Sequence, residues 1–279
     1  MHRLLVETKL LNEESPVLPA DAAKHLKVLR PKPGEEIELF DGAGKWRTYR
    51  FCASLASGED SASPLNAHSN IRTIEHSNSS LTLFACVTKG SRWDWTIEKA
   101  TELGVTRIVP VISDRTIVRI PKAERAAKRE RWLRIAEDAA RQSDAKWLPE
   151  ICEAVDFKDA LALVRETTCF VGALTNPPPE PLLAAVVEKV KVEGEGEQRR
   201  GKIPLFTSNL HLHLSTFIGP EGDFTPEELK ALLEIAIPTS FGPTVLRAET
   251  AAIFAVSVIA GAMHSNFTLT RNKERITKT

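Results

Sequence analysis

The sequence lacks the short motifs that mark common nucleotide and metal sites. It has no GxxxxGKS or GxxxxGKT segment and no GxGxxG segment after a strand, which excludes a P-loop and the usual dinucleotide fingerprint. It has no HExxH segment, and no two of its 4 cysteines form a CxxC pair. A zinc ribbon and a disulfide scaffold are therefore not indicated, and we expect no metal.

Signals for hydrolysis, export and membrane insertion are also missing. No GxSxG elbow occurs, and no cysteine has an assignable histidine partner, so a hydrolase is disfavoured. The most apolar late stretch, residues 251–263, is shorter than the roughly 20 residues of a membrane span. The N-terminus carries no cleavage signature. Lone cysteines suit a reducing compartment, so we expect a cytoplasmic protein without membrane contact.

An excess of charge of one sign is absent as well. The 279 residues contain 37 Lys and Arg against 37 Asp and Glu, which argues against binding of nucleic acid by bulk charge. The balance hides a local excess, because residues 115–134 carry eight basic and two acidic side chains, a net charge of +6. This segment is either a solvated helix face or a track for RNA phosphates.

The first part of the chain has the alternation typical of β-structure. Residues 36–40 and 45–51 alternate in polarity around a glycine-containing turn, which predicts a hairpin. Residues 21–29 are expected to form a short helix with Asp21 as its N-cap. We predict a small barrel with one helix over residues 1–75, followed by loops and a connection to a second domain over 76–279.

From Leu81 onward the pattern changes to strands alternating with helices. Strands are expected at 81–87, 107–112, 168–174 and 212–218, with a short fifth strand ending at 240–242. Helices are expected at 93–103, 123–143, 225–235 and 249–264. This alternation predicts an α/β fold with a parallel sheet covered on both faces. The polar residues within 188–204 are expected to form a flexible insertion.

Glycine- and proline-containing loops follow three of the predicted strands, at 174–179, 219–223 and 242–250. In open α/β sheets ligands bind at the carboxyl ends of the strands, and glycine permits close approach to the backbone. The Gly-Pro-Glu-Gly segment alone fits a plain strand-to-helix turn equally well. Residues 89–95 place cations beside two tryptophans, which indicates either a surface for stacking bases or core packing of at least one ring.

Three segments, taken together, resemble a known family. KGSRWDWTIEKATELGV at 89–105, FIGPEGDF at 217–224 and FGPTVLRAETA at 241–251 resemble, in order and spacing, the RsmE family of bacterial ribosomal RNA small-subunit methyltransferases E, of the SPOUT class. His25 and residues 28–30, 33–36 and 39–42 look like the PUA-like barrel of that family. The resemblance covers nearly the whole chain.

The resemblance implies methylation of N3 of a uridine in small-subunit (16S) rRNA, with S-adenosyl-L-methionine as methyl donor. It implies a PUA-like β-barrel that binds RNA (1–75) and a SPOUT methyltransferase domain (76–279). In this domain the 242–250 loop would pass through a loop of the preceding strands as a C-terminal trefoil knot. It also implies a homodimer whose partner is the rRNA or the assembled small subunit.

The resemblance also implies roles for individual residues. Arg247 would stabilise the developing anionic uracil. Glu249 would orient Arg247 or accept a proton, or else be a first-turn acid of the last helix. RNA contacts would be made by Arg30, Lys89, Arg92 and Arg115. The cofactor pocket would contain Leu174, Thr175, Asn176, Ile218, Gly219, Glu221, Gly222, Phe241, Gly242, Val245, Leu246 and Ala251.

The chain departs from the family pattern at four positions. Members commonly have Arg at the position of Thr244, Gly-Arg at Asp144-Ala145, and a second glycine at Asp223. The missing arginines motivate an alternative hypothesis, a non-catalytic RNA-binding factor of ribosome assembly with the same fold. A nucleotide-binding α/β enzyme of another chemistry is a third hypothesis, which the missing fingerprints disfavour.

Overall fold

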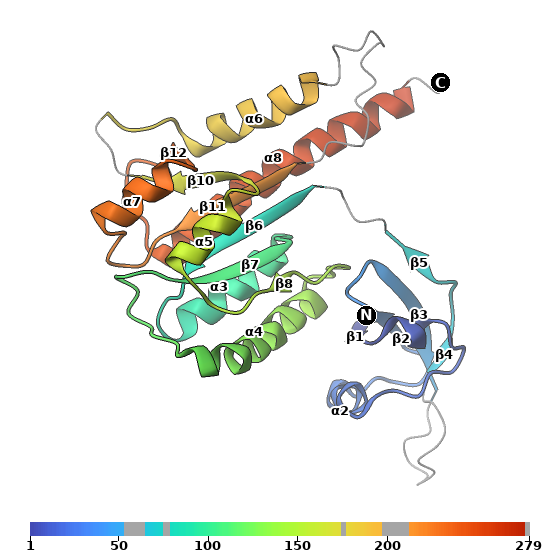
Figure 1. Cartoon of the computed structure of the whole chain (residues 1–279). Helices are drawn as coiled ribbons and strands as arrows, with labels where there is room; N and C mark the ends of the chain where they lie inside the picture. The colour runs from blue at the N-terminus through green and yellow to red at the C-terminus, as the bar shows by residue number, and fades with distance from the viewer. Residues whose placement is uncertain (53–64, 75–78, 174–176, 197–211, 277–279) are drawn as a thin grey trace. The chain divides into compact units, whose positions relative to one another are not determined.

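The chain forms two compact units. The computed structural model describes residues 1–52, 65–74, 79–173, 177–196 and 212–276. The first unit comprises Met1–His76 and Ala136–Leu148, and the second comprises Ser77–Ile135 and Pro149–Thr279 (Figure 1).

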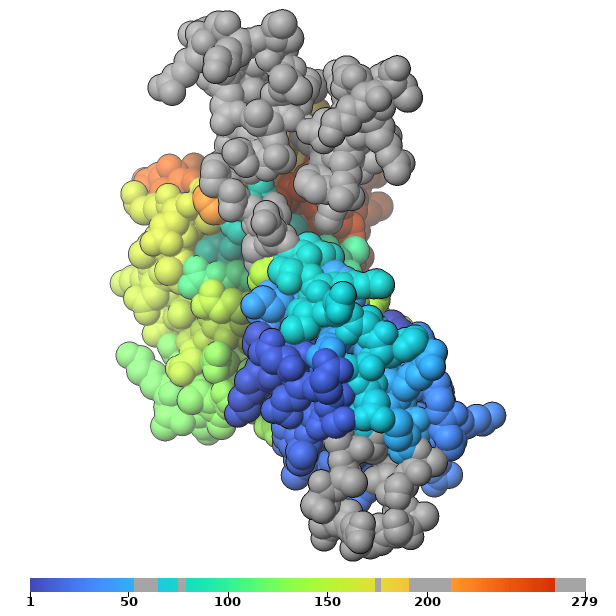
Figure 2. All heavy atoms as spheres, turned by 90° about the vertical axis from the view of Figure 1, so that its right-hand side faces the viewer, coloured from blue at the N-terminus to red at the C-terminus, as the bar shows by residue number. Residues whose placement is uncertain are grey.

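The first unit is built on a sheet that contains the predicted hairpin. In its described residues, neighbouring strands follow the order β1-β2-β3-β4, and β5 also pairs with β3. The hairpin strands β2 and β3 are antiparallel, as expected, whereas the unpredicted β1 runs parallel to β2. The N-terminal residues form a continuous surface, coloured blue to cyan in Figure 2. The strands are β1 (His2–Leu5), β2 (Glu36–Phe40), β3 (Lys45–Phe51), β4 (Leu65–Ala67) and β5 (Arg72–Thr73).

Two helices lie between β1 and β2, where the sequence predicted one. They are α1 (Thr8–Leu11) and α2 (Ala20–Leu29). A parallel pair of strands needs a crossover, and this segment supplies it. The predicted N-cap was wrong by two positions, because Pro19 occupies that position and Asp21 lies in the first turn. Leu26 of α2 packs with Leu4, Leu39 and other buried residues into a separate hydrophobic core.

A buried ionic cluster attaches residues 136–148 to this sheet. Arg3 donates a hydrogen bond from Nε to Glu38 (2.7 Å), and Lys146 donates one from Nζ to the same carboxylate (2.6 Å). The Arg3 guanidinium also donates to the carbonyl oxygens of Ala140 (2.6 Å) and Ala145 (2.9 Å). The side chains of Arg3 and Glu38 are only 5% and 3% exposed. The first unit therefore includes a segment that follows residue 75 by some sixty positions, which periodicity did not indicate.

The second unit confirms the predicted α/β fold with a parallel sheet. Its strands follow the order β12-β10-β11-β6-β7-β8, with β9 also paired to β7, and every pairing is parallel. Apolar residues on both faces of the central strands, such as Leu83 and Phe84, are fully buried. The strands are β6 (Ser80–Cys86), β7 (Arg107–Ile112), β8 (Glu150–Ile151), β9 (Val155–Asp156), β10 (Thr168–Gly172), β11 (His213–Ile218) and β12 (Ile237–Thr239).

Helices cover both faces of this sheet. Phe157 of α5 and Leu232 of α7 pack with Phe84 and Phe217 on one face. On the other face, α8 contacts β6 and β11 and lies beside α3 and α6 (Figure 1). The helices are α3 (Ser91–Glu102), α4 (Lys122–Gln142), α5 (Phe157–Val164), α6 (Leu182–Gly196), α7 (Pro226–Leu233) and α8 (Ala248–Ile276).

Helix α6 corrects one expectation. Residues 188–196 of the predicted flexible insertion continue this helix, and residues 197–204 lie outside the described residues. Val186 and Val190, four positions apart, are buried on one face, so packing holds a helix that the polar composition obscured. None of the helices that the structure describes is both long and apolar enough to cross a membrane.

Candidate functional site

Three loops meet at one edge of the parallel sheet. Residues 87–90 follow β6, residues 219–225 follow β11, and residues 240–247 follow β12. Because all these strands are parallel, their carboxyl ends lie on the same side of the sheet, where ligands bind in open α/β folds. The predicted cofactor residues Leu174, Thr175 and Asn176 follow β10 but lie outside the described residues.

The conformation of the loop after β11 requires a glycine that packs closely on an aromatic ring and a residue with a left-handed backbone conformation. A Cβ atom on Gly219 would lie 3.1 Å from the Phe224 ring, tighter than ordinary packing. Asp223 adopts φ +61°, and its Oδ1 accepts a hydrogen bond from the Phe224 N–H (2.8 Å). Beyond the loop, Thr225 and Glu228 form a capping box at the start of α7, whose first residue is the predicted N1 proline.

The loop after β12 exposes its backbone. A Cβ atom on Gly172 would approach the Phe241 ring to 2.8 Å, so only glycine permits this position of the ring. Phe241 also packs against Phe254 of α8, with ring centroids 5.8 Å apart. Gly242 adopts φ +123° with open space at its Cβ position. The N–H groups of Val245 and Leu246 form no hydrogen bond within the described residues, so they are available to solvent or a ligand.

Arg92 connects two of the predicted site segments. Its guanidinium lies 3.5 Å from Glu221 of the loop after β11 and 3.8 Å from Oε1 of Glu249 in the first turn of α8. The Arg92 side chain is 48% exposed, whereas that of Glu249 is 13% exposed. Arg92 and the two carboxylates are therefore brought together, although the resemblance implied a different role for each of them.

Other predicted residues lie apart from this group. Arg247 is exposed, and its guanidinium pairs with no acidic group in the described part of the chain, Glu249 included. Glu249 thus occupies the first-turn position of the last helix, as one alternative expected, but does not orient Arg247. Lys89 is exposed beside Gly90, and Arg30 belongs to the first unit, where it is exposed in a left-handed conformation at the end of α2.

Of the two neighbouring tryptophans, one is a core residue. Trp93 is 2% exposed and packs edge-to-face on Trp132 with a centroid distance of 5.7 Å. Trp95 is 41% exposed. The core-packing alternative is therefore correct for Trp93, and a base-stacking surface is possible only at Trp95.

The basic segment 115–134 is engaged largely within the protein. Arg115 donates to the carbonyl oxygens of Gly222 (3.0 Å) and Phe224 (3.2 Å), so it holds the loop after β11. Arg125 pairs with Asp156, and Arg131 forms two hydrogen bonds with Asp94. Because these cations already bind acceptors within the protein, the structure favours a solvated helix face over a continuous track for RNA phosphates.

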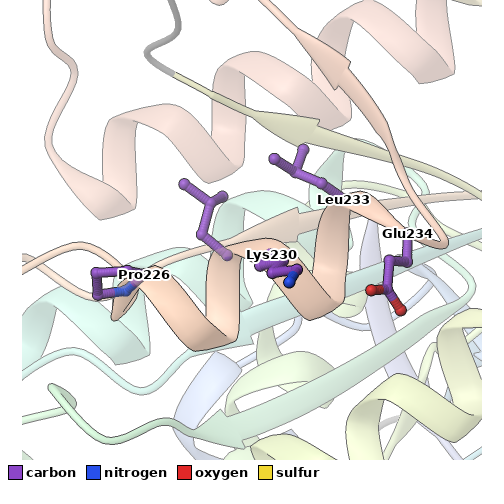
Figure 3. Close-up of a pocket in the computed structure, with 5 residues that line it drawn as sticks. Pro226, Lys230, Leu233 and Glu234 are labelled. Atoms are coloured by element: carbon purple, nitrogen blue, oxygen red, sulfur yellow. The ribbon is translucent and has the colours of Figure 1, made fainter.

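A hollow on the second unit lies along helix α7, beyond the loop after β11. It measures about 470 Å³ and runs along α7, lined by Pro226, Leu229, Lys230, Leu233 and Glu234 (Figure 3). None of the predicted site residues lines it. Among the described residues, no group of three or more His, Cys, Asp or Glu side chains is placed to hold a metal ion.

Comparison with known families assigns two parts of the chain to two domain families. Residues 75–260 match the model of the RNA methyltransferase domain, and residues 18–51 match that of the RNA methyltransferase PUA domain. The chain belongs to the RNA methyltransferase domain family. The resemblance found in the three motifs is thereby confirmed.

Individual members of the family give the same result. Ribosomal RNA small subunit methyltransferase E of Bacillus subtilis is 30% identical over 62% of this chain and 62% of its own length. The Synechocystis protein of the same name is 27% identical over 95% of this chain and 78% of its own length. A crystal structure of ribosomal RNA small subunit methyltransferase E from Neisseria gonorrhoeae bound to S-adenosyl methionine superposes with a TM-score of 0.70, at 26% identity, over 94% of this chain and 97% of that one.

The structure explains two of the departures from the family pattern. Asp144 and Asp223, at positions where glycine is common, have φ angles of +60° and +61°. Aspartate is one of the few other residues that adopts this left-handed conformation routinely, so the backbone geometry is kept without glycine. Asp144 also pairs with Arg3 (3.2 Å) and Lys146 (2.9 Å), which adds a contact that glycine cannot make.

Sequence reasoning missed Thr88, the second residue after β6. It is buried and lines a small cavity with Trp93 and Glu249. Its position immediately before Lys89-Gly90 could have indicated a site residue, but threonine at this position is part of none of the recognised motifs.

Proposed function

We propose that this protein transfers the methyl group of S-adenosyl-L-methionine to N3 of a uridine in small-subunit (16S) rRNA. The observation that supports it most is the convergence of the family's loops at the carboxyl edge of the parallel sheet, with Arg92 and Glu249 beside them. The full-length similarity to a methyltransferase crystallised with this cofactor supports the choice of methyl donor.

The described loops fit such a cofactor. Gly222 is exposed, Gly242 has open space at its Cβ position, and Val245 and Leu246 present unpaired N–H groups. Phe241 is half-buried and adds apolar surface, whereas Ile218 and Ala251 are buried apolar residues beside the same loops. When bound, the cofactor supplies an electrophilic methyl group. We assign its binding to Ile218, Gly219, Glu221, Gly222, Phe241, Gly242, Val245, Leu246 and Ala251, with Leu174, Thr175 and Asn176 completing the pocket.

The side chains beside these loops would act on the uracil. N3 carries a proton that must leave before or during methyl transfer. Glu249, whose side chain is 13% exposed, is the less exposed of the two carboxylates beside Arg92 and would accept this proton. Arg247, exposed and unpaired by any described acid, would stabilise the negative charge that develops on the uracil ring. A target base that is stacked must first be flipped out of its helix, at a cost of a few kcal/mol.

We further propose that the rRNA is held by both units. Arg30 of the PUA-like unit and Lys89, Arg92 and Arg115 of the methyltransferase unit would contact it, as free rRNA or in the assembled subunit in the cytoplasm. The 242–250 loop would form the trefoil knot. Exposed apolar side chains on α6, on the loop after β12 and on α8 support a homodimer: Leu183, Val245 and Phe254.

A methyl-transfer assay tests the proposal. The full-length protein is incubated with labelled S-adenosyl-L-methionine and with unmodified 16S rRNA or small subunits, and the digested nucleosides are analysed by mass spectrometry. We expect 3-methyluridine. Tight RNA binding without any methylated nucleoside at saturating cofactor would contradict the proposal and favour the non-catalytic assembly factor.

A further inference from the structure

Arg115 and Glu228 join two loops at the carboxyl edge of the parallel sheet. Arg115, in the loop after β7, donates from Nη1 to the carbonyl oxygens of Gly222 (3.0 Å) and Phe224 (3.2 Å) in the loop after β11. Glu228, in the first turn of α7, accepts a hydrogen bond from the N–H of Asp114 in the loop after β7 (2.9 Å). These hydrogen bonds connect residues that are 107 to 114 positions apart in the sequence.

The carboxylate of Glu228 does more than cap its own helix. In the capping box its Oε2 accepts from the N–H of Thr225 (3.0 Å), while its Oε1 is the acceptor for Asp114. A capping box requires only the first of these two bonds. Because Glu228 is 8% exposed, its carboxylate relies on these N–H groups more than on surface water. The second bond is a contact between loops that the sequence pattern of the box does not indicate.

Together these bonds fix two peptide units of the loop after β11. The unit that follows Gly222 is held through its carbonyl by Arg115 and through its N–H by the carbonyl oxygen of Pro220 (2.9 Å). The unit that follows Phe224 is held through its carbonyl by Arg115 and through its N–H by Glu228. Because a peptide unit is planar and rigid, holding both of its polar groups fixes its orientation.

The loop after β7 is itself firmly anchored. The N–H of Ser113 donates to Oγ1 of Thr116 (3.0 Å), and the N–H of Thr116 donates to the Ser113 carbonyl (3.1 Å). These two residues are 2% and 1% exposed. Arg119 donates to the carbonyl oxygens of Ser113 (3.1 Å) and Asp114 (2.6 Å). Arg115 therefore extends from a well-braced turn.

The groups that this bracing orients face solvent. Glu221 and Gly222 are exposed, and their N–H groups form no hydrogen bond within the described residues. A Cβ atom on Gly222 would lie 3.5 Å from Cβ of Arg115, so the two residues are in direct contact. Both Glu221 and Gly222 belong to the proposed cofactor site, where an unpaired N–H can bind an acceptor atom of the ligand.

We propose that Arg115 and Glu228 are positioning residues of the S-adenosyl-L-methionine site. They hold the loop after β11 in the conformation that presents Gly222 to the cofactor, and neither of them contacts the cofactor itself. The inference rests on the proposed function for the identity of the ligand. Nη1 makes both of the hydrogen bonds from Arg115, which leaves Nε and Nη2 for the proposed contact with RNA.

Calorimetry with S-adenosyl-L-methionine alone, without RNA, tests Arg115 in the full-length protein. We expect Arg115→Met to weaken cofactor binding about tenfold, the lower end of what one hydrogen bond to a charged group contributes. Arg115→Lys, which keeps a cation able to donate to one carbonyl, should recover part of this loss. Arg129→Met is the matched control, because Arg129 belongs to the same basic segment and donates to the Ile151 carbonyl of β8 (2.7 Å). Wild-type cofactor affinity in Arg115→Met would overturn the positioning role of Arg115.

Glu228 is tested against its neighbour Glu227. Glu228→Gln and Glu227→Gln both remove one negative charge from the first turn of α7, but Glu227 is exposed and only Glu228 bridges the loops. The amide has one acceptor oxygen in place of two, so it can keep only one of the two bonds. We expect Glu228→Gln to weaken cofactor binding about tenfold on the same reasoning, and Glu227→Gln to leave it unchanged. Equal affinities in these two variants would overturn the role of Glu228.

Steady-state kinetics separates positioning from a general loss of fold. In Arg115→Met and Glu228→Gln the KM for S-adenosyl-L-methionine should rise, while kcat at saturating cofactor and RNA stays within about twofold of the wild type, as expected for lost binding. A fall in kcat with an unchanged KM would overturn the proposal. A wild type that binds the cofactor but forms no 3-methyluridine would refute the proposed function, while the calorimetric comparison would still decide the roles of Arg115 and Glu228.

Discussion

The two units each contain an arginine between acidic residues, but in opposite environments. In the first unit Arg3 and Glu38 are almost fully buried and joined at 2.7 Å, with Lys146 on the same carboxylate. In the second unit Arg92 is 48% exposed and lies 3.5 Å and 3.8 Å from its two carboxylates. Breaking a buried ion pair is strongly destabilising, because it leaves an uncompensated charge in the protein interior. An exposed ion pair contributes little to stability, so its arginine can leave the carboxylates and bind a ligand.

The backbone contacts show the same difference. Arg3 also donates to three carbonyl oxygens in residues 136–148, so its removal takes a donor from each of these acceptors and from the Glu38 carboxylate. The guanidinium of Arg92, by contrast, donates to no backbone carbonyl in the described part of the chain. We therefore expect mutations in the first group to act on stability and those in the second to act on function.

The largest effect should come from Arg3→Met. Removing one partner of a buried ion pair costs on the order of 3 kcal/mol, and the loss of the cation above the Phe40 ring, 4.1 Å from its centroid, adds to it. Chemical denaturation should show the first unit unfolding at lower denaturant. The control is Lys9→Met, which breaks the exposed pair of Lys9 with Glu7 in the same unit and should leave the transition unchanged. Equal destabilisation by both variants would contradict the comparison.

The next effect should come from Glu249→Gln. If the carboxylate accepts the N3 proton, kcat should fall by about 10²-fold or more, while calorimetry should show nearly unchanged cofactor affinity and denaturation nearly unchanged stability. Glu227→Gln is the matched control, because Glu227 is an exposed carboxylate in the first turn of α7 and has no role in the proposed site. A Glu249→Gln enzyme with wild-type kcat would exclude this role.

The longer strands could be predicted from the sequence, but β1 and the full length of α6 could not. The alternation around Gly42 predicted β2 and β3, and the apolar runs predicted β6, β7, β10 and β11, because burial on one or both faces leaves a period in the sequence. Strand β1 was missed because its partner lies more than thirty residues away. Helix α6 was missed because its polar end resembled a linker.

The candidate site was predictable in its loops but not in its contacts. Gly219 and Gly242 stood out because glycine leaves a recognisable signal at positions with close packing or positive φ. The approach of Arg92 to Glu249 joins residues far apart in the sequence, and no local pattern encodes it. The basic segment misled for the converse reason, because its charge was evident while the internal acceptors of Arg115 and Arg131 were not.

A smaller effect should separate Arg92 from that basic segment. Replacing Arg92 by Met should weaken rRNA binding and reduce the slope of log affinity against log salt by about one, the change expected for one lost phosphate contact. Arg131→Met should leave the slope unchanged, because Asp94 already occupies that guanidinium. A filter-binding series at several salt concentrations measures both. Equal reductions in the two variants would restore the basic segment as an RNA track.

The smallest effect should come from Asp223, the aspartate of the second unit that has a left-handed backbone conformation. At Asp223, with φ +61°, the Gly variant should be more stable than the Ala variant by about 1 kcal/mol, because a Cβ atom is strained in this conformation. Asp21, in the first turn of α2, supplies the control: there Ala should be the more stable by a similar amount, because glycine loses more backbone entropy in a helix. At each position the Gly and Ala variants both lose the carboxylate. The difference between their free energies of unfolding therefore reports the backbone conformation alone. Denaturation curves that give the same sign at both positions would show that Asp223 is retained for its hydrogen bond to Phe224 and not for its conformation.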